Sequence, residues 1–354
     1  MSTFAKLADL PLEIDSYELE TLRFAPSPDF ERLTTVIQVM KDGLAGSGED
    51  VTYEALDAIA LADAGPHLDL TGPRTVGEFC ELMGRTDLFP VAPEREVSRN
   101  YRRWAFESAA LSLALKQADT DLASAVGREL SPLSFVASMG LGGPPGSGVP
   151  SSIDPLLEKL KRYPDLHFKL DPALDWDQDL IERLVETGAV NTLDLKGQYK
   201  GTVVDIETDP ALYRRLVAAF PEAWLEDPDL TPETKEILGP VMDRVTWDAP
   251  IHSVEEIAAL EYKPKVINIK PSRMGGLESL LDSYDYCENE GITAYGGGQW
   301  ELGIGRDQIQ YLAALFHPDA PNDTAPRGYN AAEPEPGLPV SPMELPSIGF
   351  GIPN

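Results

Sequence analysis

LHFKLD at residues 166–171 is followed by DLIERLVETG (179–188), NTLDL (191–195), ALYRRLVAAF (211–220) and AWLED (223–227). The first, third and last of these segments are short and apolar, as buried strands are, whereas the other two have the spacing of amphipathic helices. Short apolar runs that alternate with helical stretches indicate βα units whose strands run parallel. This stretch therefore predicts an α/β fold.

The same alternation extends in both directions along the chain. RVTWD (244–248), VINIK (266–270) and ITAYG (292–296) are each followed by a helical stretch, and SFVAS (134–138) supplies a first strand. The number of units approaches that of an eight-stranded TIM-type (β/α) barrel. A doubly wound open sheet is the main alternative, but no G-x-G-x-x-G turn opens the region. We therefore predict a barrel over residues 131–330.

The opening residues, 1–130, predict a separate α+β domain. Residues 16–24 and 34–40 are rich in β-branched and aromatic residues and are expected to form strands, with a loop at 25–33 between them. Residues 53–61, 76–83 and 101–125 have helical spacing. The proline-rich end, 331–354, is expected to pack back on this domain.

Composition limits the classes of function. The 354 residues carry a formal net charge of −30, which would repel phosphate backbones and anionic membrane surfaces. No apolar run reaches the roughly 18 residues that cross a bilayer. Cys80 and Cys287 lie far apart, which suggests neither a disulfide framework nor a zinc site. We expect a cytoplasmic protein that binds neither nucleic acid nor membrane.

Charged residues stand at the ends of the apolar runs, where the strands of a barrel converge on one mouth. They are Lys169 (HFKLDP), Asp194 (NTLDLKG), Glu226 (AWLEDP), Asp248 (VTWDAP), Lys270 (NIKPSRMGG) and Glu301 (GGGQWELGIGR). Any one of these carboxylates could simply cap a helix. Carboxylates on three consecutive strands instead favour a hard cation, Mg²⁺ with Mn²⁺ as the alternative. A buried lysine beside a cation gives up its proton more readily, which makes Lys169 and Lys270 candidate bases.

At these residues the chain resembles the enolase superfamily, specifically its muconate-lactonizing branch, which includes o-succinylbenzoate synthases and dipeptide epimerases. IKPSRMGG is the most specific motif, and GGGQWELGIGR resembles the seventh strand and its loop. The resemblance implies that Asp194, Glu226 and Asp248 bind the metal ion and that the opening domain caps the barrel. It also implies that Lys169 and Lys270 act on the substrate, and that the chain forms homo-oligomers.

Two positions depart from the superfamily pattern. The second strand usually carries Lys-x-Lys, whereas this chain has His167-Phe168-Lys169, so that His167 replaces the first lysine. Lys196 follows Asp194 where the superfamily often has Ala-Asn, and it is either an added cation or a surface lysine. We predict that His167, Lys196 and Glu301 contact the substrate.

The resemblance implies an enzyme that removes the proton next to a substrate carboxylate and stabilises the resulting enediolate with the metal ion. The substrate is a small carboxylate, and the loop at 25–33 would close over it. A dehydratase or cycloisomerase like o-succinylbenzoate synthase is the first hypothesis. An epimerase of amino-acid derivatives, with Asp319 and Asp323 as weak candidates to bind an amino group, and a non-catalytic carboxylate-binding barrel are the alternatives.

Overall fold

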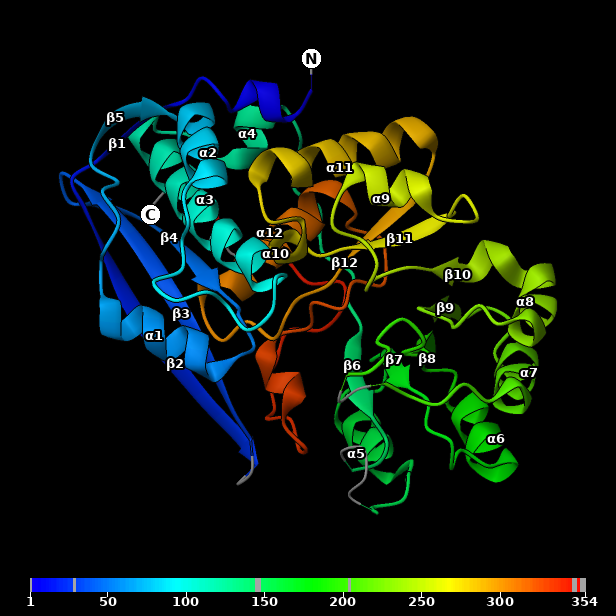
Figure 1. Cartoon of the computed structure of the whole chain (residues 1–354). Helices are drawn as coiled ribbons and strands as arrows, with labels where there is room; N and C mark the ends of the chain where they lie inside the picture. The colour runs from blue at the N-terminus through cyan, green and yellow to red at the C-terminus, as the bar shows by residue number, and fades with distance from the viewer. Residues whose placement is uncertain (1, 28–29, 144–147, 203–204, 346–348, 351–354) are drawn as a thin grey trace.

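The computed structural model describes residues 2–27, 30–143, 148–202, 205–345 and 349–350. Figure 1 shows a strand-rich N-terminal part beside a barrel of parallel strands surrounded by helices. Among the described residues, no helix combines the length and the apolar character needed to span a membrane.

The N-terminal part is built on a three-stranded antiparallel sheet of order β2-β3-β4. Its elements are η1 (Phe4–Lys6), β1 (Pro11–Ile14), β2 (Ser16–Ser27), β3 (Phe30–Lys41), β4 (Leu44–Asp50), α1 (Ala55–Ala64), β5 (Gly72–Thr75), α2 (Val76–Arg85), α3 (Ser98–Gln117) and α4 (Leu122–Val126). Helix α3 lies directly on β4. The two backbones approach so closely that a Cβ at Gly46 or Gly48 would collide with the backbone of α3. The sheet and α3 thus form two layers packed against each other.

The structure corrects the predicted loop at residues 25–33. The β2–β3 ladder continues through Phe24↔Arg32, and β2 ends at Ser27 while β3 begins at Phe30. Cross-strand pairing thus extends the hairpin well beyond the β-branched runs that predicted its strands. Residues 28–29, the remainder of the predicted lid, lie outside the described residues.

Within the described residues, the barrel contains seven strands together with the helices that follow them. The strands are β6 (Ala137–Gly140), β7 (Phe168–Asp171), β8 (Val190–Asp194), β9 (Trp224–Glu226), β10 (Val245–Thr246), β11 (Val266–Ile269) and β12 (Thr293–Gly296). The helices are α5 (Asp154–Arg162), α6 (Gln178–Thr187), α7 (Pro210–Ala219), α8 (Pro232–Leu238), η2 (Gly239–Arg244), α9 (Val254–Ala259), α10 (Pro271–Met274), α11 (Leu277–Glu290), α12 (Ile304–Phe316) and η3 (Arg327–Asn330). Strands β6 to β10 form one parallel sheet, and β11 pairs with β12.

Single bridges and backbone bonds close the barrel. Asn268 N donates to Trp247 O at 2.9 Å and so joins β11 to the end of β10. On the other side, the parallel bridges Gly297↔Asp323 and Phe135↔Asn322 place residues 322–323 between β12 and the residues before β6. These two residues occupy the position of the eighth strand, so the chain forms a capped TIM-type barrel, as the sequence predicts.

The described end of the chain contacts both parts of the molecule. Met343 pairs with Leu133 just before the barrel. The Phe350 ring lies between Trp104 of α3 and Tyr311 of α12, with centroid distances of 6.3 and 6.1 Å. The tail therefore covers the junction between α3 and the barrel helices.

Candidate active site

Strand register places the candidate carboxylates at one level of the barrel. Asp194 and Glu226 are direct partners across β8 and β9, and Lys169 pairs one layer lower with Thr192. Because side chains alternate along a strand, Lys169 and Asp171 both point into the barrel. The carboxyl ends of β7, β8 and β9 therefore direct a lysine and three carboxylates toward one point.

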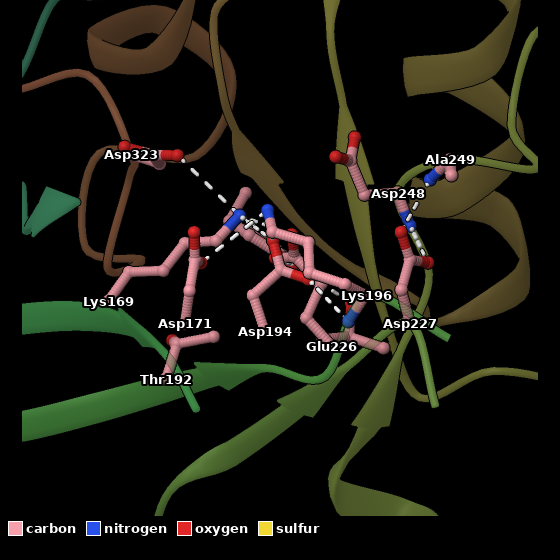
Figure 2. Close-up of polar contacts among 12 residues, drawn as sticks. Lys169, Asp171, Thr192, Asp194, Lys196, Glu226, Asp227, Asp248, Ala249 and Asp323 are labelled. Atoms are coloured by element: carbon pink, nitrogen blue, oxygen red, sulfur yellow. Dashed lines mark hydrogen bonds and ion pairs between the residues drawn. The ribbon is translucent and has the colours of Figure 1, made fainter. Parts of the chain in front are cut away.

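The Lys169 amine lies at the centre of this group (Figure 2). Its Nζ is 3.0 Å from Asp194 Oδ2 and 3.6 Å from Asp323 Oδ2, and it donates to Glu226 Oε1. Burial alone would lower the pKa of Lys169, but the negative charges of Asp194 and Glu226 raise it well above its ordinary value. Lys169 is therefore a charged counter-ion in this structure.

Asp194 and Glu226, the two fully buried carboxylates that contact Lys169, repel one another. Burial, reinforced by the charge of Asp194, raises the pKa of Glu226 well above its ordinary value. Asp194 behaves differently: despite its burial, the ammonium groups of Lys169 and Lys196 lower its pKa. Such a cluster needs cationic charge to stay ionised.

Three fully buried carboxylates could hold a metal ion here. Oxygen atoms of Asp194, Glu226 and Asp227 lie within 4.8 Å of one another. An all-carboxylate donor set suits a hard divalent cation such as Mg²⁺. Asp227 also accepts backbone hydrogen bonds from Asp248 N and Ala249 N, each 2.8 Å long. Burial, followed by the charge of Asp248, raises the pKa of Asp227 to about 7.

Asp248 lies beside this cluster, and its side chain binds other groups. Its Oδ2 accepts from Lys270 Nζ at 2.8 Å and from the Tyr199 hydroxyl at 3.0 Å, and its Oδ1 accepts from an Arg273 Nη at 3.0 Å. In Figure 2 its carboxylate stands apart from those of Asp194 and Glu226. The structure thus brings together Asp194 and Glu226 of the predicted ligand set, with Asp227 as their third neighbour.

Lys196 adds a second ammonium group to the mouth. Its Nζ lies 2.6 Å from Asp194 Oδ2 and 3.4 Å from Asp171 Oδ1. The residue has a φ of 54°, a left-handed conformation that is uncommon outside glycine and asparagine. This backbone turn directs the lysine side chain back toward the carboxylates.

Two other predicted contacts lie outside the cluster. His167 is exposed and precedes β7, and its carbonyl oxygen accepts from Ala137 N at the start of β6, so it lies at the opposite end of the barrel from the mouth. The structure therefore does not bring His167 to the site, because the inward-facing positions that reach the mouth are 169 and 171. Glu301 is buried in its own loop, where it accepts from Gln299 N at 2.7 Å and pairs with Arg306 at 3.3 Å.

The sequence prediction omitted several residues of the mouth. Asp171 was detectable, because it follows Lys169 by two residues and a strand has a period of two. Arg273 stands in the quoted motif KPSRMGG, but its contact with Asp248 depends on the short helix α10 that follows β11. Tyr295 reaches the site from β12, and no local pattern marks it. Asp323, which the sequence suggested only as a partner for a substrate amino group, reaches Lys169 from the closing segment.

Models of known protein families match two long stretches of this chain. A family model described as the C-terminal domain of a domain of unknown function (DUF8230) matches residues 129–331. The N-terminal domain model of the same description matches residues 5–125. The chain belongs to the DUF8230 family.

Named relatives and solved structures connect the chain with the enolase superfamily. It is 25% identical over 315 residues to an o-succinylbenzoate synthase of Geobacillus stearothermophilus. The alignment covers 83% of this chain and 77% of that protein. It is 38% identical over 61 residues to an N-succinylamino acid racemase of Amycolatopsis sp, which covers 17% of each protein.

Solved structures give the same result for the fold. A dipeptide epimerase from Methylococcus capsulatus complexed with Mg ion is 20% identical, with a TM-score of 0.66 over 88% of this chain and 90% of that one. A muconate cycloisomerase from Pseudomonas fluorescens is 16% identical, with a TM-score of 0.61 over 89% and 87%. The predicted resemblance to the enolase superfamily and its capped barrel are confirmed.

Proposed function

We propose that this protein is a metal-dependent enzyme that removes the proton next to the carboxylate of a small substrate. The observation that carries the proposal is the buried cluster of Asp194, Glu226 and Asp227, with Lys169 in contact with it and Lys270 close by. A bound Mg²⁺ or Mn²⁺ would supply Lewis-acid stabilisation of the negative charge that develops on the substrate carboxylate. The relatives named as synthase, racemase, epimerase and cycloisomerase support this class of chemistry.

Asp194 and Glu226 belong both to the ligand set expected from the sequence and to the buried cluster. We propose these two as metal ligands. The third ligand is Asp248 according to the superfamily resemblance and Asp227 according to the distances. Separate Asp227→Asn and Asp248→Asn variants distinguish the two assignments by their loss of metal affinity.

Lys169 and Lys270 are suited to act on opposite faces of a substrate. Lys169 lies on the second strand of the barrel and Lys270 follows the sixth, so they project from opposite walls of an eight-stranded ring. An amine on each face allows one lysine to accept the α-proton while the other, in its charged form, donates a proton. Delivery of a proton from the charged lysine to the opposite face gives racemisation, and departure of a β-substituent gives elimination.

The first candidate activity is that of a dehydratase or cycloisomerase like o-succinylbenzoate synthase, the name of a relative whose match covers 83% of this chain. One observation favours the second candidate, a racemase or epimerase of amino-acid derivatives. The Asp323 carboxylate faces Lys169 in the mouth, where it could also bind a substrate amino group (Figure 2). Asp319 is exposed and lies outside the mouth. A non-catalytic carboxylate-binding barrel is the third candidate.

We further propose a cytoplasmic homo-oligomer whose capping domain comprises residues 1–130, completed by 331–354, with a catalytic barrel at 131–330. Lys196 is proposed to contact the substrate, because its amine lies at the mouth. Glu301 is also proposed to contact the substrate, because its loop follows β12 and passes beside Lys270. His167, at the opposite end of the barrel, is not proposed again.

Hydrogen exchange in D₂O tests the proposed function. N-succinyl amino acids, dipeptides and the hydroxylated precursor of o-succinylbenzoate are incubated with protein and Mg²⁺, and deuterium uptake, optical rotation and loss of water are followed by mass spectrometry, polarimetry and absorbance. We expect exchange with at least one class, and Lys270→Met should lower its rate by at least about 100-fold. Lys263→Met is the control, because that lysine side chain is 61% exposed.

The products separate the candidate activities. Loss of water supports the dehydratase, and loss of optical rotation supports the racemase. Saturable binding of these carboxylates with no exchange in any of them would contradict the enzymatic proposal and favour the non-catalytic barrel.

A further inference from the structure

Tyr295 connects strand β12 to a proposed metal ligand on β9 through the interior of the barrel. The residue is fully buried, and its hydroxyl donates to Glu226 Oε2. Thr246, also fully buried, donates from Oγ1 to the Tyr295 oxygen at 3.2 Å. The three side chains come from β9, β10 and β12, so this contact depends on the closed barrel.

The direction of these hydrogen bonds is fixed by the donors available. A phenol carries a single hydrogen, and the Tyr295 oxygen already accepts from Thr246. Its own hydrogen is therefore free to point at Glu226. One oxygen of the Glu226 carboxylate thus contacts Lys169 and the other contacts Tyr295, which fixes the rotation of the carboxylate group.

We infer that Tyr295 is a positioning residue that holds Glu226 Oε2, so that Oε1 faces the place where a divalent cation would bind. The inference rests on the proposed function, because it assumes that Glu226 is a metal ligand. Oε1 is the atom that contacts the Lys169 ammonium, so this oxygen already faces a positive charge. Groups that orient metal ligands in this way typically change metal affinity by about 10- to 100-fold when they are removed.

The packing of the ring supports a fixed position. The Tyr295 ring lies 5.0 Å from that of Trp224, centroid to centroid, on the strand that carries Glu226. A purely apolar role would be met by phenylalanine, without the cost of burying a hydroxyl group. The hydroxyl is instead used in two hydrogen bonds, one of which ends on a candidate ligand.

Calorimetric titration with Mg²⁺ tests the inference, using wild type, Tyr295→Phe and Thr246→Val. We expect the dissociation constant of Tyr295→Phe to rise by about tenfold or more and that of Thr246→Val to rise less, because Tyr295 keeps its contact with Glu226. Tyr311→Phe is the matched control: this buried tyrosine bonds Ala123 N outside the barrel mouth. Melting curves of the metal-free proteins report whether each variant folds.

The outcomes separate this inference from the proposed function. If wild type binds Mg²⁺ and Tyr295→Phe binds it equally well, the positioning role is wrong while the metal site stands. If wild type shows no saturable binding, both fail. Should Tyr295→Phe not fold, Thr246→Val decides: weaker binding than in Tyr311→Phe supports the inference, and equal binding overturns it.

Discussion

His317 is a buried histidine that the proposed chemistry does not use. Its Nδ1 lies 2.7 Å from Asn322 Oδ1, and its Nε2 lies 3.4 Å from the Tyr284 hydroxyl. The same Asn322 oxygen accepts from Gly296 N, and the amide nitrogen donates to three carbonyl groups, including that of Ser134. Asn322 thus joins β12 to the first strand region, and His317 supports it.

Burial lowers the pKa of His317 from 6.5 to about 4. Above pH 6.5 the histidine is neutral in both the folded and the unfolded chain. Between pH 6.5 and 4 the unfolded chain binds a proton that the folded chain does not. The free energy of unfolding therefore decreases as the pH is lowered through this range, by up to about 3 kcal/mol. Urea unfolding at several pH values measures this slope.

The His317→Gln variant should lose this part of the slope. Tyr284→Phe keeps the histidine and removes only a neighbouring hydroxyl, so it should keep the slope. If His317→Gln and Tyr284→Phe had the same pH dependence between pH 4 and 6.5, a buried neutral His317 would be contradicted.

At the scale of elements, helix α12 begins on a carboxylate from the other part of the molecule. Glu49 of β4 is fully buried, and it accepts from Leu302 N at 2.6 Å, Gly303 N at 2.9 Å and Gly305 N at 2.8 Å. The first turn of a helix leaves N–H groups without partners, and its dipole favours negative charge there. Glu49 therefore stabilises α12 and joins it to the N-terminal sheet.

Glu49→Gln should lower the free energy of unfolding by about 2 kcal/mol, because it removes the charge that strengthens these buried hydrogen bonds. Glu78→Gln is the matched control: Glu78 accepts from Thr75 N in the first turn of α2 but is exposed, so its loss should cost less than about 1 kcal/mol. Chemical denaturation measures both. Equal losses would contradict a special role for the buried cap.

Elements with a strong local pattern could be predicted, and elements defined by distant pairing could not. Alternating apolar runs and helical stretches predicted the barrel, because each unit has its own periodicity. The closing residues 322–323 have no such pattern, since they are held by single bridges and by Asn322. The β2–β3 hairpin is longer than expected because cross-strand pairing, and not composition, decides where it ends.

The same reasoning explains the candidate site. Lys169, Asp194 and Glu226 could be found because they end apolar runs. Asp227 follows Glu226 with a φ of 49°, and this left-handed turn places its carboxylate beside those of Asp194 and Glu226. Sequence position alone does not reveal such a turn, nor the partners that hold Asp248.

At the scale of the whole molecule, the N-terminal part and the barrel are joined through polar contacts. Glu107 of α3 accepts from Leu277 N at the start of α11, and Asn100 donates to Arg273 O. Arg32 of β3 donates to the Gln299 carbonyl in the loop after β12. The segment from α10 to the start of α11 and the loop after β12 are therefore both held by the N-terminal part.

The net charge of −30 affects any measurement of metal binding. An acidic surface attracts divalent cations diffusely, and salt screens this attraction at a Debye length of about 3 Å in 1 M salt. Buried carboxylates are screened much less. High salt therefore distinguishes the cluster around Glu226 from the surface.

The most direct test is a calorimetric titration of Mg²⁺ at high salt into wild type, Glu226→Gln and Glu186→Gln. Glu186 is exposed on α6, so its substitution removes the same charge from the surface. We predict saturable binding by wild type and Glu186→Gln and none by Glu226→Gln. Indistinguishable titrations of all three proteins would contradict the buried metal site and, with it, the proposed metal-assisted reaction.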